Sequence, residues 1–172
     1  MIFFLTVIIS AFMSFVCSSL AEDASIFFAF AALIGIVLIG ILFDIVGVAV
    51  TAADAAPFHS MASRKVPEAQ DALKLLRNAN RVSSFCNDVI GDVCGVISGS
   101  ASAVIATRVL MLRKTGSELW MNLIFSALVA GLTVGGKAFG KTVGLGNSTE
   151  VVRRTAKTIC FFRRMFKRKK RR

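Results

Sequence analysis

Residues 25–53 read SIFFAFAALIGIVLIGILFDIVGVAVTAA, and this apolar stretch decides the class of fold. Its only ionisable side chain is Asp44, and as a helix it exceeds the roughly 20 residues that cross about 30 Å of hydrocarbon. Pro57 stands just beyond it, where proline and the residue before it both resist helical continuation. The stretch therefore predicts a transmembrane helix.

Three further apolar segments flank this helix, at residues 2–20, 82–111 and 119–140. The first could instead be a signal peptide, since Ser19-Leu20-Ala21 resembles a cleavage site, but no cation precedes the apolar run and we favour an uncleaved helix. Apolar residues make up 55% of the chain, which is high for a soluble protein and ordinary for a polytopic membrane protein. We therefore expect an all-α integral membrane protein with about four transmembrane helices.

Two basic segments lie outside these helices. Residues 60–81 contain a short helix that begins at Pro67-Glu68, and we expect one or two juxtamembrane helices at the membrane interface. Residues 147–172 follow the transmembrane domain of residues 1–146 and hold eleven of the 21 Lys and Arg. Because cations favour the cytoplasmic side, we expect a multi-pass protein of the cell membrane with both termini in the cytoplasm.

The net charge of +11 could indicate a nucleic-acid-binding protein. The excess is concentrated in the C-terminal tail, however, where Phe and Ile alternate with Arg and Lys, and this pattern favours an amphipathic helix on a membrane surface. Each cation near an anionic leaflet contributes about 1 kcal/mol. We therefore expect the lipid bilayer, and anionic lipids bound by the tail, as partners, and no nucleic acid.

Polar side chains interrupt the predicted spans at helical spacing. Ionisable residues inside a membrane cost at least roughly 2.5–3.5 kcal/mol each and usually serve a function. The second span gathers a hydroxyl and a carboxylate on the face of Asp44, and the third gathers carboxylates and an amide beside glycines spaced by four. Such oxygens are hard ligands that suit Mg²⁺. The candidate metal ligands are Thr51, Asp54, Asn87, Asp88 and Asp92.

Another interpretation of these polar groups stays open. They could cap helix ends or bond across helices, and Lys137 and Lys141 near the end of the fourth span could neutralise them as ion pairs. An ion pair of this kind would compete with cation binding. The direction of the Lys137 side chain discriminates between the two, because a lysine that reaches the interface instead leaves the oxygens to a metal ion.

Short motifs stand at the ends of these helices. The second span ends Thr51-Ala-Ala-Asp54-Ala-Ala56, the third opens Val82-Ser-Ser-Phe-Cys-Asn87-Asp88, and the fourth ends Gly136-Lys-Ala-Phe-Gly-Lys141-Thr. In this order they resemble the transmembrane domain of the CorB/CorC/cyclin M family of magnesium and cobalt transporters, where the corresponding motifs are Ser-x-Ser-Glu-Thr-Ala-like, asparagine-bearing and Gly-Glu-x-x-Pro-Lys. Lys137 stands where that family has its glutamate, and Gly140 where it has proline.

The resemblance implies a divalent-cation transporter for Mg²⁺ or Co²⁺, a homodimer, and an ion held by the oxygen ligands named above. It is a divergent one, and the family's paired cytosolic nucleotide-binding (CBS) domains are not expected in a chain of 172 residues. The alternative is a non-transporting scaffold or regulator, in which Lys137 neutralises the acidic site and the tail binds anionic lipid or a partner protein.

Catalysis is not indicated. His59 is the only histidine, no residues suggest a nucleophile–base pair, and no glycine-rich phosphate loop follows a strand. We therefore expect neither an enzyme nor an organic cofactor.

Overall fold

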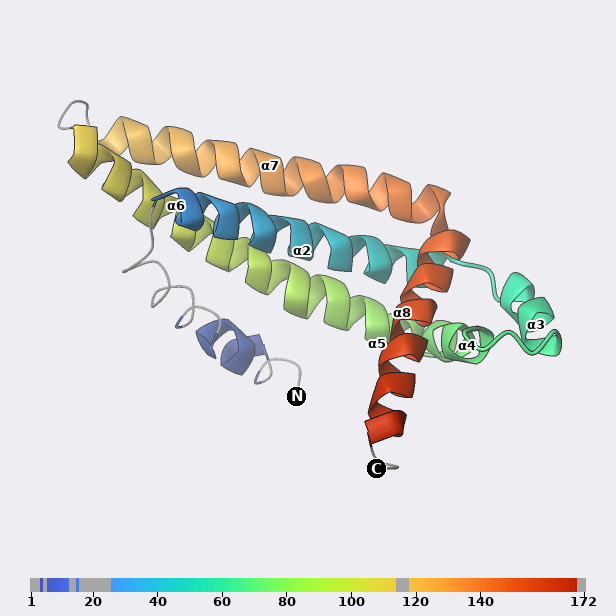
Figure 1. Ribbon diagram of the computed structural model, residues 1–172. Coiled ribbons are helices and arrows are strands. Elements are labelled where there is room, and N and C mark those ends of the chain that lie inside the picture. The colour runs from blue at the N-terminus through green and yellow to red at the C-terminus, as the bar shows by residue number, and fades with distance from the viewer. Residues whose placement is uncertain (1–3, 5, 13–14, 16–25, 114–117, 170–172) are drawn as a thin grey trace. The chain divides into compact units, whose positions relative to one another are not determined.

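The computed structural model describes residues 4, 6–12, 15, 26–113 and 118–169. Within these ranges all regular structure is helical (Figure 1), which confirms the all-α class for this part of the chain. The labelled elements are α2 (Ile26–Ala52), α3 (Ala56–Ser63), α4 (Ala69–Arg77), α5 (Ala79–Ser84), the π-helix η1 (Phe85–Gly91), α6 (Asp92–Arg113), α7 (Glu118–Gly146) and α8 (Ser148–Lys169).

Three helical stretches are long and apolar enough to cross a membrane, namely Ile26–Ala52, Ala79–Val109 and Leu123–Gly146. They correspond to the second, third and fourth predicted spans, so the chain is a helical membrane protein. The last of them continues beyond the predicted end at residue 140, because its glycines are tolerated in transmembrane helices. The first predicted span, residues 2–20 with its cleavage-like motif, lies mostly outside the described residues, as do the last three cations of the tail, and these stay predictions.

The chain divides into two compact units. The first comprises residues 1–43 and 87–138, and the second comprises residues 44–86 and 139–172. Both α2 and α7 cross the division, so each contributes one end to the first unit and the other end to the second.

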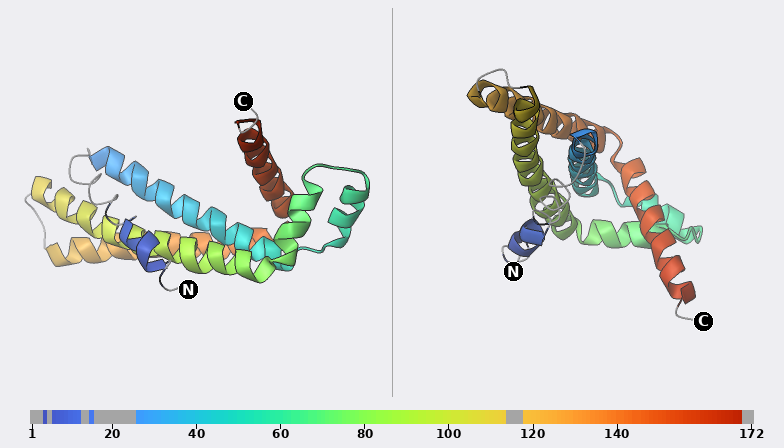
Figure 2. Two further views of the ribbon diagram at one scale, coloured as in Figure 1. Left: turned by 90° about the horizontal axis from the view of Figure 1, so that it is seen from below. Right: turned by 60° about the vertical axis from the view of Figure 1, so that its left-hand side comes forward.

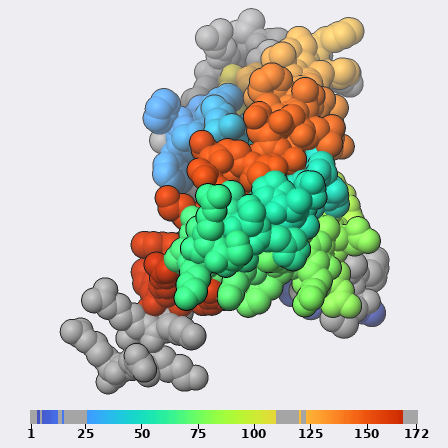
Figure 3. Space-filling view, turned by 90° about the vertical axis from the view of Figure 1, so that its right-hand side faces the viewer, coloured from blue at the N-terminus to red at the C-terminus, as the bar shows by residue number. Residues whose placement is uncertain are grey.

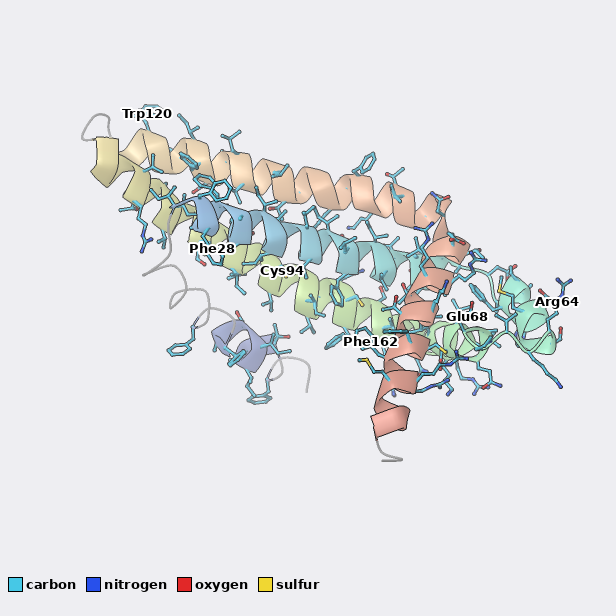
Figure 4. The ribbon with its side chains drawn as sticks, viewed as in Figure 1. Phe28, Arg64, Glu68, Cys94, Trp120 and Phe162 are labelled. Atoms are coloured by element: carbon cyan, nitrogen blue, oxygen red, sulfur yellow. The ribbon has the colours of Figure 1, made fainter. Side chains whose placement is uncertain are left out.

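In the first unit, segments of α2, α6 and α7 lie side by side (Figures 1 and 2). A Cβ atom added at Gly40 would lie 3.0 Å from the Cβ of Cys94, which is labelled in Figure 4, so α2 and α6 approach closely there. The rings of Phe30 and Phe125, with centroids 6.1 Å apart, join α2 to α7. Large apolar side chains point outward, and Phe27 is 85% exposed, as expected where lipid replaces water.

The second unit is built around α4, which packs against both α3 and α8. Figure 3 shows α8 (red) beside these helices (green). Three residues of α8 spaced by four, Val152, Ala156 and Cys160, are buried, so one stripe of this amphipathic helix faces inward. The core consists of Ala49, Val50, Phe58, Ala72, Val152 and Ala156. Exposed cations such as Lys65 and Arg153 lie on the outside of this unit, together with exposed apolar residues such as Phe139 and Phe161.

Candidate functional site

The third span contains the π-helical segment η1, directly after α5. Such turns are rare inside α-helices and occur often at functional sites. Two predicted ligands, Asn87 and Asp88, lie within it, and Asp92 begins α6 directly after it. The side chains of Asp88 and Asp92 are exposed and that of Asn87 is partly buried. The acidic part of the predicted site therefore coincides with an irregular turn of the helix.

Lys137 of α7 contacts this acidic segment. Its Nζ lies 3.6 Å from Oδ1 of Asp92, and it donates a hydrogen bond of 3.1 Å to the carbonyl oxygen of Gly91. A carbonyl oxygen has two lone pairs, so Gly91 can accept this bond in addition to a helical one. The Lys137 side chain is only 22% exposed. Its ammonium is thus directed into the polar segment.

The strength of this contact depends on whether water or lipid surrounds it. In water an exposed ion pair contributes about 0–1 kcal/mol. Within a membrane either charge alone is expensive, and a lower dielectric constant strengthens the attraction between the two. The Asp92 side chain is 70% exposed, so the contact is stronger than a surface ion pair where lipid, and not water, covers that side chain.

Thr51 and Asp54, the other two predicted ligands, lie at the end of α2 in the second unit. The Thr51 hydroxyl donates a hydrogen bond of 2.8 Å to the carbonyl oxygen of Val48. Oδ1 of Asp54 accepts a bond of 3.1 Å from the backbone N–H of Ala56, the first residue of α3. Both side chains thus have local partners, and Asp54 forms the turn that starts the next helix.

The five predicted ligands fall into two groups. Thr51 and Asp54 belong to the second unit, while Asn87, Asp88 and Asp92 belong to the first. Among the described residues, no three His, Cys, Asp or Glu side chains come together in a group that could hold a metal ion. A shared Mg²⁺ site formed by all five therefore stays a prediction.

Asp44 is the residue that the predicted ligand set omitted. It lies within the most apolar helix and is only 4% exposed. Its Oδ2 atom is buried and has no hydrogen-bond partner among the described residues. Burying a carboxyl group in this way costs free energy, so intramembrane acids usually serve a function. The signal was present in the sequence, because Asp44 is the only ionisable residue of α2.

Comparisons with protein-family models, with curated proteins and with solved structures find no match for this chain. The resemblance to the CorB/CorC/cyclin M transporters rests on the short motifs at the helix ends. This resemblance stays a prediction, and so does the homodimer that it implies.

Proposed function

We propose that this chain is a membrane-embedded scaffold or regulator, in which Lys137 takes the place of a bound cation. The observation that carries the proposal is the double contact of the Lys137 ammonium with Asp92 and with the Gly91 carbonyl, at 3.6 Å and 3.1 Å. A lysine directed into the acidic segment is the feature that distinguishes the non-transporting alternative from the transporter.

The charge of Lys137 opposes a second cation at the same place. Two unit charges 4 Å apart interact by about 4 kcal/mol at an effective dielectric constant of 20, and a divalent ion doubles that repulsion. The ammonium also occupies acceptors that an ion would need, namely Oδ1 of Asp92 and the Gly91 oxygen. A divalent cation is therefore disfavoured both by repulsion and by the loss of ligands.

The second part of the proposal is that the second unit interacts with the membrane surface. The helices α3 to α5 connect α2 to α6, and α8 follows α7, so three alternating crossings leave them all on one side of the membrane. Exposed cations are numerous there, among them Lys65, Arg77 and Arg153, and positive charge favours the cytoplasmic side. An anionic lipid surface matches this charge.

The test is uptake of Mg²⁺ and Co²⁺ into liposomes that contain the purified protein, with protein-free liposomes as the blank. We expect no uptake above the blank for the native chain. Lys137→Glu introduces the residue that the resembling family carries at this position, and we expect it to permit uptake. Lys141→Glu is the matched control, because it makes the same charge change at an exposed position of the same helix.

Uptake by the native chain that Asp88→Asn abolishes would overturn the proposal in favour of the transporter. Equal uptake by the Lys137→Glu and Lys141→Glu variants would also contradict it, because the effect would then come from net charge and not from the contact with Asp92. Circular dichroism and gel filtration of each variant establish that it is folded.

A further inference from the structure

A cavity of about 360 Å³ lies between the turn that joins α3 to α4 and the C-terminal half of α8. Its polar lining consists of Lys65 and Gln70 on one side and Arg163 and Arg164 on the other. No acidic residue is among the described side chains that line it. Three cations from two elements far apart in the sequence thus converge on one cavity, whose volume falls in the range of ligand pockets.

Asp71 of α4 holds one of these cations in place. Its Oδ1 lies 2.7 Å from Nη1 of Arg163, and the Asp71 side chain is only 6% exposed. A guanidinium has five N–H donors, so this bond fixes Arg163 while leaving further donors for a ligand. Lys65 and Arg164 make no ion pair with any described residue. The cavity therefore keeps a positive charge that the protein itself does not neutralise.

Lys65 occupies an unusual backbone conformation that places it at the cavity. Its φ angle is 58°, in the left-handed region where glycine is strongly preferred. The N–H of Lys65 donates to the carbonyl oxygen of Ala62, and the N–H of Val66 donates to that of Met61. These two bonds form a Schellman motif, which closes the C-terminus of α3 and ordinarily carries glycine at this position. A lysine here costs stability, and such strain points to function.

The surroundings of the cavity match a lipid and not only a soluble anion. The helices α3 and α8, which supply residues of the cavity, begin within a few residues of the ends of the membrane-spanning helices α2 and α7. On α8, next to the basic residues, Phe161 is 64% exposed and Phe162, which is labelled in Figure 4, is 50% exposed. Cations beside exposed aromatic rings are typical of segments that contact lipid head groups and acyl chains.

We propose that this cavity binds the phosphate monoester of an anionic phospholipid head group, through Lys65, Arg163 and Arg164. A phosphate monoester carries up to two negative charges and three acceptor oxygens, which suits several converging donors better than the single charge of a phosphodiester. The inference deepens the proposed contact of α8 with anionic lipid and rests on it. It adds a defined pocket and a preference for one type of head group.

The experiment measures binding of dioctanoyl phosphatidic acid to the full-length protein in a neutral detergent, with dioctanoyl phosphatidylglycerol as the phosphodiester. We expect the monoester to bind more tightly. Replacing Lys65 by Asn keeps a residue that tolerates the left-handed conformation and removes one charged donor, so binding of the monoester should weaken about tenfold. Lys157→Asn is the matched control on the exposed face of α8, outside the cavity, and should change binding little.

Two outcomes separate this inference from the general contact between α8 and lipid. If Lys65→Asn and Lys157→Asn weaken both lipids equally, the cavity is not the site, while the general contact of α8 with anionic lipid stands. If neither lipid binds, both fail. Inorganic phosphate that competes with the lipid at equal concentration would overturn the lipid as the source of the phosphate.

The Lys65→Gly variant distinguishes a ligand-binding role of Lys65 from a purely structural one, because the two roles predict different changes in the melting temperature and in lipid binding. Glycine relieves the backbone strain, so the melting temperature should rise while binding of phosphatidic acid falls. A fall in both quantities would mean that Lys65 supports the turn and does not bind the ligand, which would overturn its assigned role.

Discussion

The first unit exposes many of its large apolar residues, whereas the second gathers apolar residues from four helices into one core. In the first, Phe27 is 85% and Val134 67% exposed, while Gly40 is buried between helices. In the second, Phe58 and Val152 are completely buried, and the exterior is rich in Lys and Arg. The first arrangement suits lipid, where small residues let helices approach, and the second suits water, where apolar burial drives packing. One chain therefore relies on two different sources of stability.

The largest expected effect comes from replacing one phenylalanine in each unit by alanine and comparing the two losses of stability. Phe58→Ala removes a fully buried ring from the core of the second unit and should lower the free energy of unfolding by about 3–5 kcal/mol. Phe27→Ala removes a ring that is 85% exposed and should change it by less than about 0.5 kcal/mol. Denaturation of each purified variant in detergent measures both. Equal losses would show that the two units are not stabilised differently.

A smaller effect is expected from replacing two glycines of α7 by alanine. One of these glycines packs closely against another helix, and the other has no neighbouring atom of the described residues where a Cβ would lie. A Cβ added at Gly144 would lie 3.0 Å from the backbone oxygen of Ile45, whereas at Gly135 it would meet nothing within 4 Å. Gly144→Ala should therefore destabilise the protein by about 1–3 kcal/mol, because a backbone atom must shift.

Gly135→Ala supplies the control on the same helix, since alanine is the better helix former by about 1 kcal/mol. Its melting temperature should stay unchanged or rise. A drop in the melting temperature of Gly135→Ala as large as that of Gly144→Ala would mean that the open face is covered in the purified protein, for example by the predicted second copy of the chain.

The apolar spans could be predicted from the sequence, whereas the contacts between distant segments could not. An apolar run is a local property, and α2 ends within one residue of the predicted limit. Arg163 and Asp71, by contrast, are 92 residues apart in the sequence, and Lys137 and Gly91 are 46 apart. Composition indicates that such charges need partners, but the choice of partner depends on packing.

The candidate site shows the same limit. Helical spacing identified the polar face of the third span but not the π-helix that carries Asn87 and Asp88, because winding responds to tertiary contacts. The most regular apolar stripe of the tail, Val152, Ala156 and Cys160, packs inside the second unit, and the contact of the tail with the membrane stays a prediction. An amphipathic pattern predicts that a face will be covered and leaves open whether lipid or protein covers it.

The smallest expected effect concerns an exposed ion pair of α8, in the second unit. Nε of Arg154 donates a hydrogen bond of 3.0 Å to Oε1 of Glu150, and Nε of Arg153 lies 3.1 Å from Oε2. The hydrogen bond from Arg154, with the nearby charges, holds the pKa of Glu150 below its usual 4.5. A carboxylate with a lowered folded-state pKa stabilises the protein above its unfolded pKa and loses that contribution as the pH falls through the folded value.

Stability should therefore be level above about pH 5 and decline slightly under more acid conditions, and Glu150→Gln should remove that part of the decline.

Because the ion pair of Glu150 is exposed to water, about 1 M salt should weaken its effect. The contact of Lys137 with Asp92 should keep its effect in salt, since salt screens charges poorly within a membrane. Melting curves of the native chain, Glu150→Gln and Lys137→Gln at low and high salt compare the two pairs directly. Equal salt sensitivity would place both pairs in water and contradict a membrane location for Lys137.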